Sequence, residues 1–388
     1  MFQLIKILLK TKFELYKPKQ KNILIFDNTG ADTPYYRYLK KKDCEILFVK
    51  GEKINLYVIF VLILKFKKIT LGEYINQYIE LHKPKFIFHN SYNYRFFLLN
   101  KKNFTFEFTK VFTQSELKNE KEHNNFINKR KNLQSDYMFV WNKGMKNLME
   151  KNIEGKYIVN GAFLNNEGPL IKSDKLKRKI SFISQFRTFR KNYFGNYGYK
   201  YTYEQFYKAD IELAILLKNF CIKNNLELEI IGSSINDKEN EKKFFKNKLG
   251  SKGWKFIESS REKRGIYLTA ESKFIVTIDS TLGYECLARG QRVCFFSIRS
   301  KYLNIKDHLR FGWPLNLPEE GKCWTTNNLE KDFNRLINFL VYADDIEWKK
   351  ILENELRDLV FYNEGNLIFK DFLLKNNLLN ENIEQKFN

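Results

Sequence analysis

One stretch of the sequence, residues 274–297, constrains the fold of this chain more than any other. It reads FIVTIDSTLGYECLARGQRVCFFS: an apolar strand, a short Asp-Ser-Thr turn, a helix from about Leu282 that ends at Gly290, and a second apolar strand. This is the pattern of a βαβ unit, in which a helix connects two parallel strands. Because parallel sheets are covered by helices on their faces, the stretch predicts an α/β protein.

The same alternation of short apolar runs and helical patterns continues through the rest of the chain. In the first half we expect strands at 22–27, 44–49, 86–89, 110–113, 137–141 and 157–160. In the second half we expect strands at 180–184, 228–231, 254–257, 274–278 and 293–296, long helices at 203–223, 238–249 and 282–289, and further helices between 329 and 379. These elements predict two doubly wound, Rossmann-like sheets.

The segment 165–179, NNEGPLIKSDKLKRK, loses the apolar period and collects Gly, Pro and charge, as a linker does. A chain of 388 residues also favours two domains. We therefore expect domains at 1–168 and 169–388, the second including the terminal helices. Two such domains that face each other hold a ligand between the carboxyl ends of their strands.

The composition is that of a folded protein with a strongly basic surface. Hydrophobic residues make up 43%, Gly and Pro number only 18 and 6, and 68 Lys and Arg against 45 Asp and Glu give a net charge of +23. Such a charge favours phosphates, nucleic acid or anionic lipid as partners. Lys and Arg are dispersed and no RNP-like or helix-turn-helix pattern is present, so no nucleic-acid partner is expected, although a basic nucleic-acid-binding protein stays an alternative.

No run of apolar residues in the sequence is long enough to cross a bilayer. The longest, 56–64, is expected to be a buried helix or strand. Residues 1–21 mix apolar residues with lysines and lack a small-residue cleavage site, which argues against a secretory signal. They form either a basic amphipathic helix on the inner face of the cytoplasmic membrane or a first helix packed on the domain. The expected location is cytoplasmic, and peripheral at that membrane in the first case.

The five cysteines contain no CxxC pair, so reduced and mostly buried thiols are expected. The four histidines are scattered and no Asp-x-Asp triplet is present. We expect no metal and no cofactor.

The turn and helix start at 279–283 form the strongest candidate binding site. The hydroxyls of Ser280 and Thr281 and the amides of Leu282 and Gly283, next to Asp279, stand where a helix N-terminus attracts phosphate. Plain helix capping by the two hydroxyls is the structural alternative.

Glu285 lies four residues after Thr281, one too far for a capping box. Its carboxylate is therefore a candidate acceptor for the two hydroxyls of a ribose. The alternative is a solvated acid in the first turn of the helix.

Other strand ends of the second half add candidate donor-binding residues. Ser184 and Gln185 lie where the strand at 180–184 ends, and Arg187 follows in the loop, where it could clamp a phosphate or a sugar carboxylate. Gly232 and Ser233 end the strand at 228–231. A surface role for Arg187 and a simple turn at Gly232 are the alternatives.

The first half offers candidate catalytic and acceptor-binding residues. Asp27 follows an apolar strand and could act as general base or as nucleophile, unless it merely caps the turn; Glu116 is the second candidate. His89, Asn90 and Gln114 end neighbouring strands and could contact acceptor hydroxyls.

The run DSTLGYECLARGQRVCFFS resembles the donor-nucleotide motif of GT-B glycosyltransferases, in particular a family of bacterial surface-carbohydrate (O-antigen or capsule) biosynthesis proteins. Further stretches fit that family in order: KPKFIFHN at 83–90, NGAFLNN at 160–166, SFISQ at 181–185 and RFGWP at 310–314. The resemblance covers most of residues 22–330. It departs after Gln114, where Ser115-Glu116 stands in place of Gln-Asn-Gly.

This resemblance implies a GT-B fold and metal-independent transfer of a sugar from a nucleotide donor to a glycan or lipid-linked glycan acceptor. The donor motif is also similar to that of transferases that use CMP-activated ulosonic acids such as Kdo, which implies that class of donor. A non-catalytic protein with the same fold is a further alternative.

Overall fold

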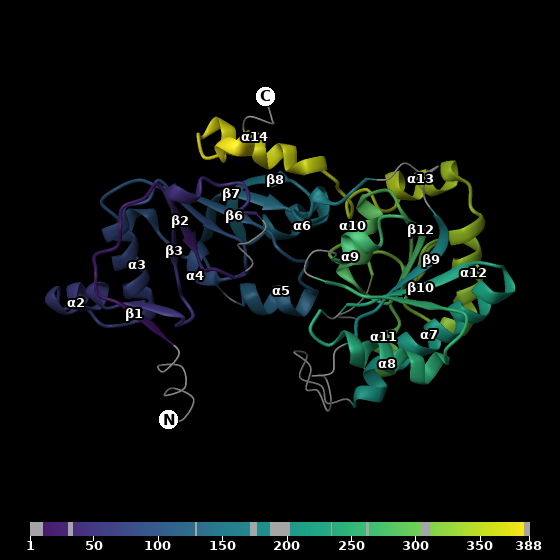
Figure 1. Cartoon of the computed structure of the whole chain (residues 1–388). Coiled ribbons are helices and arrows are strands. Elements are labelled where there is room, and N and C mark those ends of the chain that lie inside the picture. The colour runs from purple at the N-terminus through teal and green to yellow at the C-terminus, as the bar shows by residue number, and fades with distance from the viewer. Residues whose placement is uncertain are drawn as a thin grey trace.

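The computed structural model describes residues 11–29, 34–128, 130–170, 177–186, 202–233, 235–260, 264–303 and 311–383. These residues form two six-stranded parallel sheets with helices around them (Figure 1). The predicted α/β class with two parallel sheets is confirmed.

The first sheet has its earliest strand inside and not at an edge. In spatial order its strands are β3 (Cys44–Leu47), β2 (Ile23–Phe26), β5 (Phe86–His89), β6 (Thr109–Thr113), β7 (Leu133–Val140) and β8 (Ile153–Val159). The chain moves from β2 to β3, then returns to the other side of β2 to add β5. The strand order therefore reverses between β2 and β5, and the carboxyl ends of these two strands flank a switch point.

The second sheet has the strand order of a Rossmann domain. Its strands are β11 (Lys255–Ile257), β10 (Glu227–Ile231), β9 (Lys177–Ile183), β12 (Ser272–Thr277), β13 (Arg292–Phe296) and β14 (Trp324–Thr325). The order reverses between β9 and β12. The crevice beyond the ends of these two strands is the position where such sheets bind ligands.

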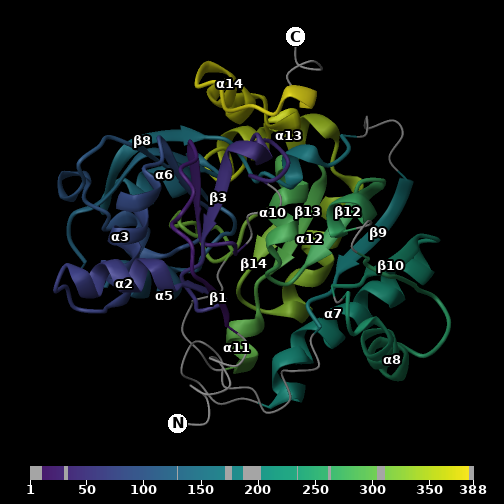
Figure 2. The ribbon, with the colours of Figure 1, turned by 60° about the vertical axis from the view of Figure 1, so that its left-hand side comes forward.

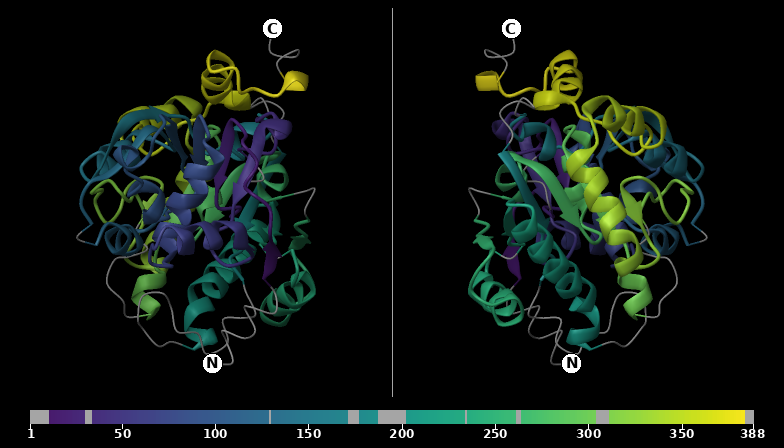
Figure 3. Two further views of the ribbon diagram at one scale, coloured as in Figure 1. Left: turned by 90° about the vertical axis from the view of Figure 1, so that its left-hand side faces the viewer. Right: turned by 90° about the vertical axis from the view of Figure 1, so that its right-hand side faces the viewer.

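Helices cover both faces of each sheet, as Figure 2 and Figure 3 show. The first half holds α2 (Leu56–Leu64), α3 (Leu71–His82), α4 (Tyr94–Phe97), α5 (Glu120–Ile127) and α6 (Lys143–Met149), with short 3₁₀ turns at Lys41–Asp43, Lys101–Asn103 and Asn165–Glu167. The second half holds α7 (Tyr203–Lys223), α8 (Lys238–Leu249), α9 (Gly265–Leu268), α10 (Thr281–Ala288), α11 (Arg299–Leu303), α12 (Leu329–Tyr342) and α13 (Asp345–Asn354). After a 3₁₀ turn at Glu364–Asn366, the chain forms α14 (Leu367–Lys375).

The last helix, α14, packs on the first sheet although it was expected with the second half. Its Phe369 and Phe372 belong to the same buried cluster as Ile23 and Ile25 of β2, while the neighbouring residues of β2 face a separate core on the other side. A central strand that is apolar on both faces needs cover on both, and α14 supplies the second cover. The division at 168 stays a prediction, and α14 would be counted with the first domain.

Buried asparagines hold this returning segment in place. Asn366 accepts hydrogen bonds from the side-chain amides of Asn160 and Asn166, at 3.2 and 2.8 Å, and Asn363 donates to Asn160 at 3.0 Å. The stretch NGAFLNN therefore binds the chain's own C-terminal segment.

Two expectations for the N-terminal part need correction. Lys12–Glu14 form strand β1, paired with β4 (Lys53–Asn55), so a helix does not extend through 1–21; Met1–Lys10 lie outside the described residues. The apolar run 56–64 is a helix, but it is not buried: only Val58 and Leu62 are. One face of α2 is covered by the domain, and the other is open to solvent.

Among the described residues, none of the helices has the length and hydropathy to span a bilayer.

The cysteines agree with the expectation of reduced thiols. All five are free; four are buried and Cys44 is partly exposed.

Candidate active site

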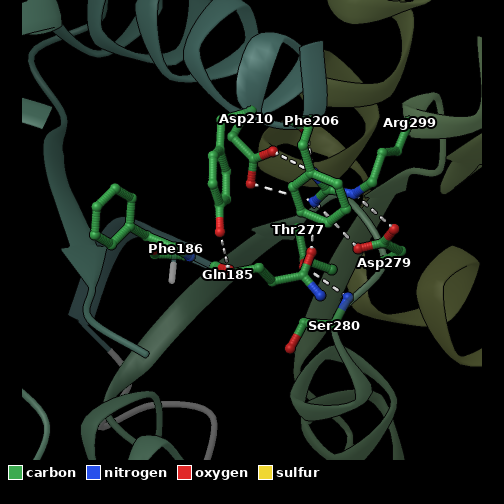
Figure 4. A network of polar contacts seen from close by, with 10 residues as sticks. Gln185, Phe186, Phe206, Asp210, Thr277, Asp279, Ser280 and Arg299 are labelled. Atoms are coloured by element: carbon green, nitrogen blue, oxygen red, sulfur yellow. Dashed lines mark hydrogen bonds and ion pairs between the residues drawn. The ribbon is translucent and has the colours of Figure 1, made fainter. Parts of the chain in front are cut away.

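A buried arginine organises the switch point of the second sheet. Figure 4 shows the side chains of Gln185, Asp210 and Asp279 converging on Arg299. Arg299 donates to Asp279 Oδ2 from Nε at 3.0 Å, to Asp210 Oδ2 from Nη1 at 2.8 Å, and to Gln185 Oε1 from Nη2 at 2.8 Å. Its guanidinium also lies 4.3 Å from the ring centre of Phe206.

These contacts fix the charge on Arg299. Burial opposes the positive charge, but the carboxylates of Asp210 and Asp279 outweigh it and raise the pKa of the guanidinium above its ordinary value. A permanent cation thus stands behind the turn. Asp279 and the Gln185 oxygen are engaged by Arg299 and so position the turn, whereas the Gln185 amide nitrogen takes no part in these contacts.

The start of α10 shows helix capping by Ser280, which was the structural alternative to phosphate binding. Ser280 Oγ accepts a hydrogen bond from the Leu282 amide at 3.3 Å, and the Gly283 amide donates to the Ser280 carbonyl at 3.0 Å. Thr277 Oγ1 holds the Ser280 amide at 3.2 Å. The two helix amides predicted to bind phosphate therefore have partners here. The Ser280 hydroxyl proton and the exposed Thr281 are the groups still open to a ligand.

Gly283 has a packing role. A Cβ atom at this position would lie 2.8 Å from side-chain atoms of Phe295 and Thr277. The glycine lets α10 approach β12 and β13 closely, which brings the helix start to the sheet edge.

Two of the predicted donor residues, Ser184 and Ser233, contact a buried glutamate of α8, and Gly232 lies next to Ser233. Ser184 donates to Glu241 Oε1 at 2.5 Å, and the Ser233 amide donates to the same oxygen at 3.0 Å. Glu241 is fully buried. A Cβ on Gly232 would lie 2.8 Å from the ring of Phe256. These residues are tied into the protein and shape the loops beside the crevice.

Glu285 lies at the junction of the two halves. The cavity around it is lined by Tyr284, Asn142 and Asn165, among others, and the Asn165 side chain donates to the Glu285 carbonyl at 3.0 Å. The Glu285 carboxylate makes no hydrogen bond with any described residue. Burial raises the pKa of this carboxyl to about 7, against the opposing effect of Arg289.

The switch point of the first sheet holds Asp27 in a strained backbone conformation. Asp27 has a φ of 73°, a region that few residues other than glycine adopt. Its Oδ1 accepts from the amide and hydroxyl of Thr29 at 3.1 and 3.0 Å, and its Oδ2 lies 3.0 Å from Lys50 Nζ. The side chain is only 1% exposed. Oδ1 thus accepts the hydrogen bonds of the turn, while Oδ2 pairs with a lysine whose side chain is half-exposed.

His89 sits beside Asp27 as a neutral side chain. Burial lowers its pKa to about 4. Its Nδ1 lies 2.6 Å from the Phe26 carbonyl, which can only accept, so Nδ1 carries the proton and Nε2 accepts from Ser91 at 3.2 Å. His89 joins the ends of β2 and β5.

The other acceptor-side candidates differ in exposure. Gln114 is buried and holds the loop: its amide donates to the Glu116 carbonyl, and its oxygen accepts from the Trp141 amide, both at 3.0 Å. Asn90 is buried at the end of β5. Glu116 is exposed and pairs with Lys118 at 2.5 Å.

A tryptophan of the RFGWP stretch bridges the halves. Trp313 Nε1 donates to the Lys118 carbonyl at 2.5 Å, and its ring lies 6.2 Å from that of His123. It fastens the loop that carries Glu116 to the second half. This is a structural role for the tryptophan.

Among the predicted site residues, Arg187 lies outside the described part of the chain. Within the described part, no three His, Cys, Asp or Glu side chains are grouped so that they could hold a metal ion.

Arg299, Asp210, Glu241 and Lys50 were missed by the sequence reasoning. Glu241 had a signal, since it stands four and eight residues before the buried Phe245 and Leu249 and so shares their helix face. Arg299 also had one, because it follows β13, the neighbour of β12, and Asp279 comes two residues after β12.

Comparison with known proteins identifies a family. Residues 111–377, more than half of the chain, match the model of a family described as "putative O-antigen biosynthesis protein". A search of curated proteins finds no match.

Solved structures with similar folds come from several sources. UDP-GlcNAc 2-epimerase from Neisseria meningitidis, bound to UDP-GlcNAc, is 13% identical over 94% of this chain and 100% of its own, with a TM-score of 0.46. The wall teichoic acid polymerase TagF is 13% identical over 92% of this chain and 90% of its own, with a TM-score of 0.44. A glycosylation-associated protein complex from Streptococcus agalactiae is 10% identical over 79% of this chain and 57% of that chain, with a TM-score of 0.44. Likeness at this level carries no information about chemistry.

Proposed function

Because the chain belongs to the family of O-antigen biosynthesis proteins, we propose that it is a glycosyltransferase that moves a sugar from a nucleotide donor to a surface-glycan acceptor. One observation carries this proposal. Each of the two parallel sheets has polar residues at its own switch point, and contacts such as Asn165 with Glu285 join the two halves beside the second of them. Two crevices in one molecule suit a reaction with two substrates.

The donor nucleotide would bind at the second sheet. The Ser280 hydroxyl, the exposed Thr281 and the amide of Gln185 can donate to phosphate, and the Glu285 carboxylate can accept from the ribose hydroxyls. Similarity of the motif to transferases for CMP-activated ulosonic acids makes a CMP donor the finer form of this proposal.

The acceptor would bind at the first sheet. As general base, Asp27 Oδ2 would take the proton of an acceptor hydroxyl, and the oxygen of that hydroxyl would form a bond to the anomeric carbon of the donor sugar. The bond from that carbon to the donor phosphate breaks, and the nucleotide leaves with the electron pair. As nucleophile, Asp27 would form the first of two such bonds itself.

A thermal-shift screen tests the proposal directly. A nucleotide or nucleotide sugar that binds only the folded protein raises its melting temperature. CMP, UDP and their sugar conjugates are compared with a single-stranded oligonucleotide. Stabilisation by the oligonucleotide alone would favour the nucleic-acid-binding alternative, and nucleotide-sugar binding without turnover would favour the non-catalytic one.

Glu285→Ala is expected to weaken binding of the nucleotide by about 1–3 kcal/mol, roughly 5- to 150-fold, because the two ribose hydroxyls lose their charged acceptor. Isothermal titration calorimetry measures this change. Glu330→Ala removes a first-turn glutamate from α12 and is the matched control, with wild-type affinity expected. Equal affinity of the two variants would remove Glu285 from the site.

Nucleotide affinity is expected to rise with pH and to level off above about 7, which is the pKa of the Glu285 carboxyl in the protein without ligand. Only the ionised carboxylate accepts from both hydroxyls, so binding lowers this pKa and releases a proton whenever Glu285 starts protonated. Glu285→Gln should make this part of the profile flat. A wild-type profile without the rise contradicts the assignment.

A further inference from the structure

The solvent-facing side of α2 and the turn after it carry exposed apolar side chains that the packing of the fold does not require. Five large apolar side chains lie on it: Phe60, Ile63, Leu64, Phe66 and Ile69 are 54, 54, 60, 97 and 58% exposed. We call this set the α2 surface. Single exposed apolar residues are common on proteins, but a contiguous group usually marks an interaction site.

Phe66 adds a second, independent observation. The helix ends in a Schellman motif, in which the Lys67 amide donates to the Leu62 carbonyl and the Phe66 amide to that of Ile63, at 3.0 and 2.9 Å. Phe66 occupies the position where glycine is usual and has a φ of 53°. A phenylalanine here costs backbone strain and buries almost no surface, so neither packing nor the turn explains it.

The charge around the surface is positive. Residues 56–72 contain Lys65, Lys67 and Lys68 and no acidic residue. The nearest acid on the adjoining helix, Glu73, pairs with Lys67 at 3.1 Å. Apolar side chains ringed by lysines match the interface of an anionic bilayer, where aromatic and aliphatic groups insert and lysines meet the headgroups.

Strand β1 lies against α2, and its segment also carries exposed apolar side chains. Figure 1 and Figure 2 place β1 and α2 together below the first sheet, and Phe13 and Leu15 of this segment are 50 and 76% exposed. The acid of this strand, Glu14, is engaged, since it forms an ion pair with Lys53. Lys17 and Lys19 follow and are exposed.

The surface adjoins the predicted acceptor site. Thr11, next to β1, donates to the Gly51 carbonyl at 2.7 Å, and Lys50 of the same loop pairs with Asp27. A membrane held at the α2 surface would therefore lie on the Asp27 side of the first sheet.

We propose that the α2 surface, continued by β1, is the face with which this protein lies on an anionic lipid bilayer, so that an acceptor carried by a membrane lipid is presented to the first sheet. The choice of acceptor rests on the proposed function, whereas the binding to lipid does not.

Vesicle co-sedimentation of the full chain, without nucleotide, tests this proposal. Wild-type protein is expected to bind vesicles of phosphatidylglycerol and phosphatidylcholine, and to bind phosphatidylcholine vesicles more weakly. The pair Ile63→Ser and Leu64→Ser should lower binding at least about tenfold, because two apolar side chains no longer enter the interface. The pair Ile222→Ser and Ile346→Ser, at positions 59 and 68% exposed in the second half, is the matched control and should bind as wild type.

Phe66→Gly separates the proposal from any effect on folding. Glycine relieves the strained φ, so the melting temperature should stay equal or rise, while vesicle binding falls. Unchanged vesicle binding in this variant and in the Ile63, Leu64 pair would overturn the proposal. The proposal would also be overturned if the wild-type protein does not bind vesicles but forms a dimer, measured by light scattering, and the double variant at Ile63 and Leu64 does not form that dimer. Nucleotide affinity of that pair should be unaffected, so failure here leaves the test of the donor site intact.

Discussion

Replacement of Arg299 by leucine is expected to lower the free energy of unfolding by about 3–5 kcal/mol, the usual loss when one partner of a buried ion pair is removed. The side chains of Arg299 and Asp210 are each 1% exposed, and that of Asp279 is 9% exposed. Leucine would leave two carboxylates without their cation, the fully buried one of Asp210 and the mostly buried one of Asp279. Urea denaturation, followed by circular dichroism, measures the loss.

An exposed arginine with similar pairing gives the control. Arg335 pairs with Asp332 at 3.0 Å, but its side chain is 42% exposed. Arg335→Leu should cost less than Arg299→Leu, because the Arg335 side chain reaches water and the buried Asp332 keeps the hydrogen bond that it accepts from Thr325. Adding Asp210→Asn to Arg299→Leu should restore part of the stability, because one unpaired charge is removed. Losses of similar size at the two arginines would contradict the role given to Arg299.

Apart from the two-residue β14, the strands of the two six-stranded sheets were predictable from the sequence because their local pattern is strong, whereas the short β1 and β4 were not. The strand expected at 274–278 is β12, Ser272–Thr277, and the helix expected at 203–223 is α7 with the same limits. Strands of parallel sheets are buried on both faces and read as continuous apolar runs, so their positions need no knowledge of their neighbours. The path of α14 did need such knowledge. The sequence around Phe369 and Phe372 does not indicate whether they pack on the first or on the second sheet.

The candidate site was predictable in position but not in detail. A residue that follows a strand of a parallel sheet must lie at its carboxyl edge, which is why Gln185, Asp279 and Asp27 were found. Their partners come from other segments: Arg299 from the helix after β13 and Lys50 from the loop after β3. A side chain in such a position can face the ligand or the protein, and only the packing of those segments decides between them.

Asp27→Asn is expected to lower glycosyl transfer at least about 100-fold, the lower range for a lost general base, while nucleotide affinity stays at the wild-type value. The amide keeps the size of the side chain and an oxygen for the Thr29 contacts, but it can neither take a proton nor act as nucleophile. Single-turnover assays with the donor found by thermal shift measure the rate. Calorimetry with the same nucleotide serves as the folding control.

Asparagine is the right substitution because of the backbone at this position. With a φ of 73°, Asp27 lies in the left-handed region, where asparagine and aspartate are both tolerated and alanine is not, so Asp27→Ala would combine loss of charge with strain. Lys50 loses its ion pair in either variant, and Lys50→Met controls for that loss. If Asp27→Asn keeps near wild-type turnover, Asp27 serves the turn alone. Glu116→Gln then becomes the variant in which a loss of transfer is expected.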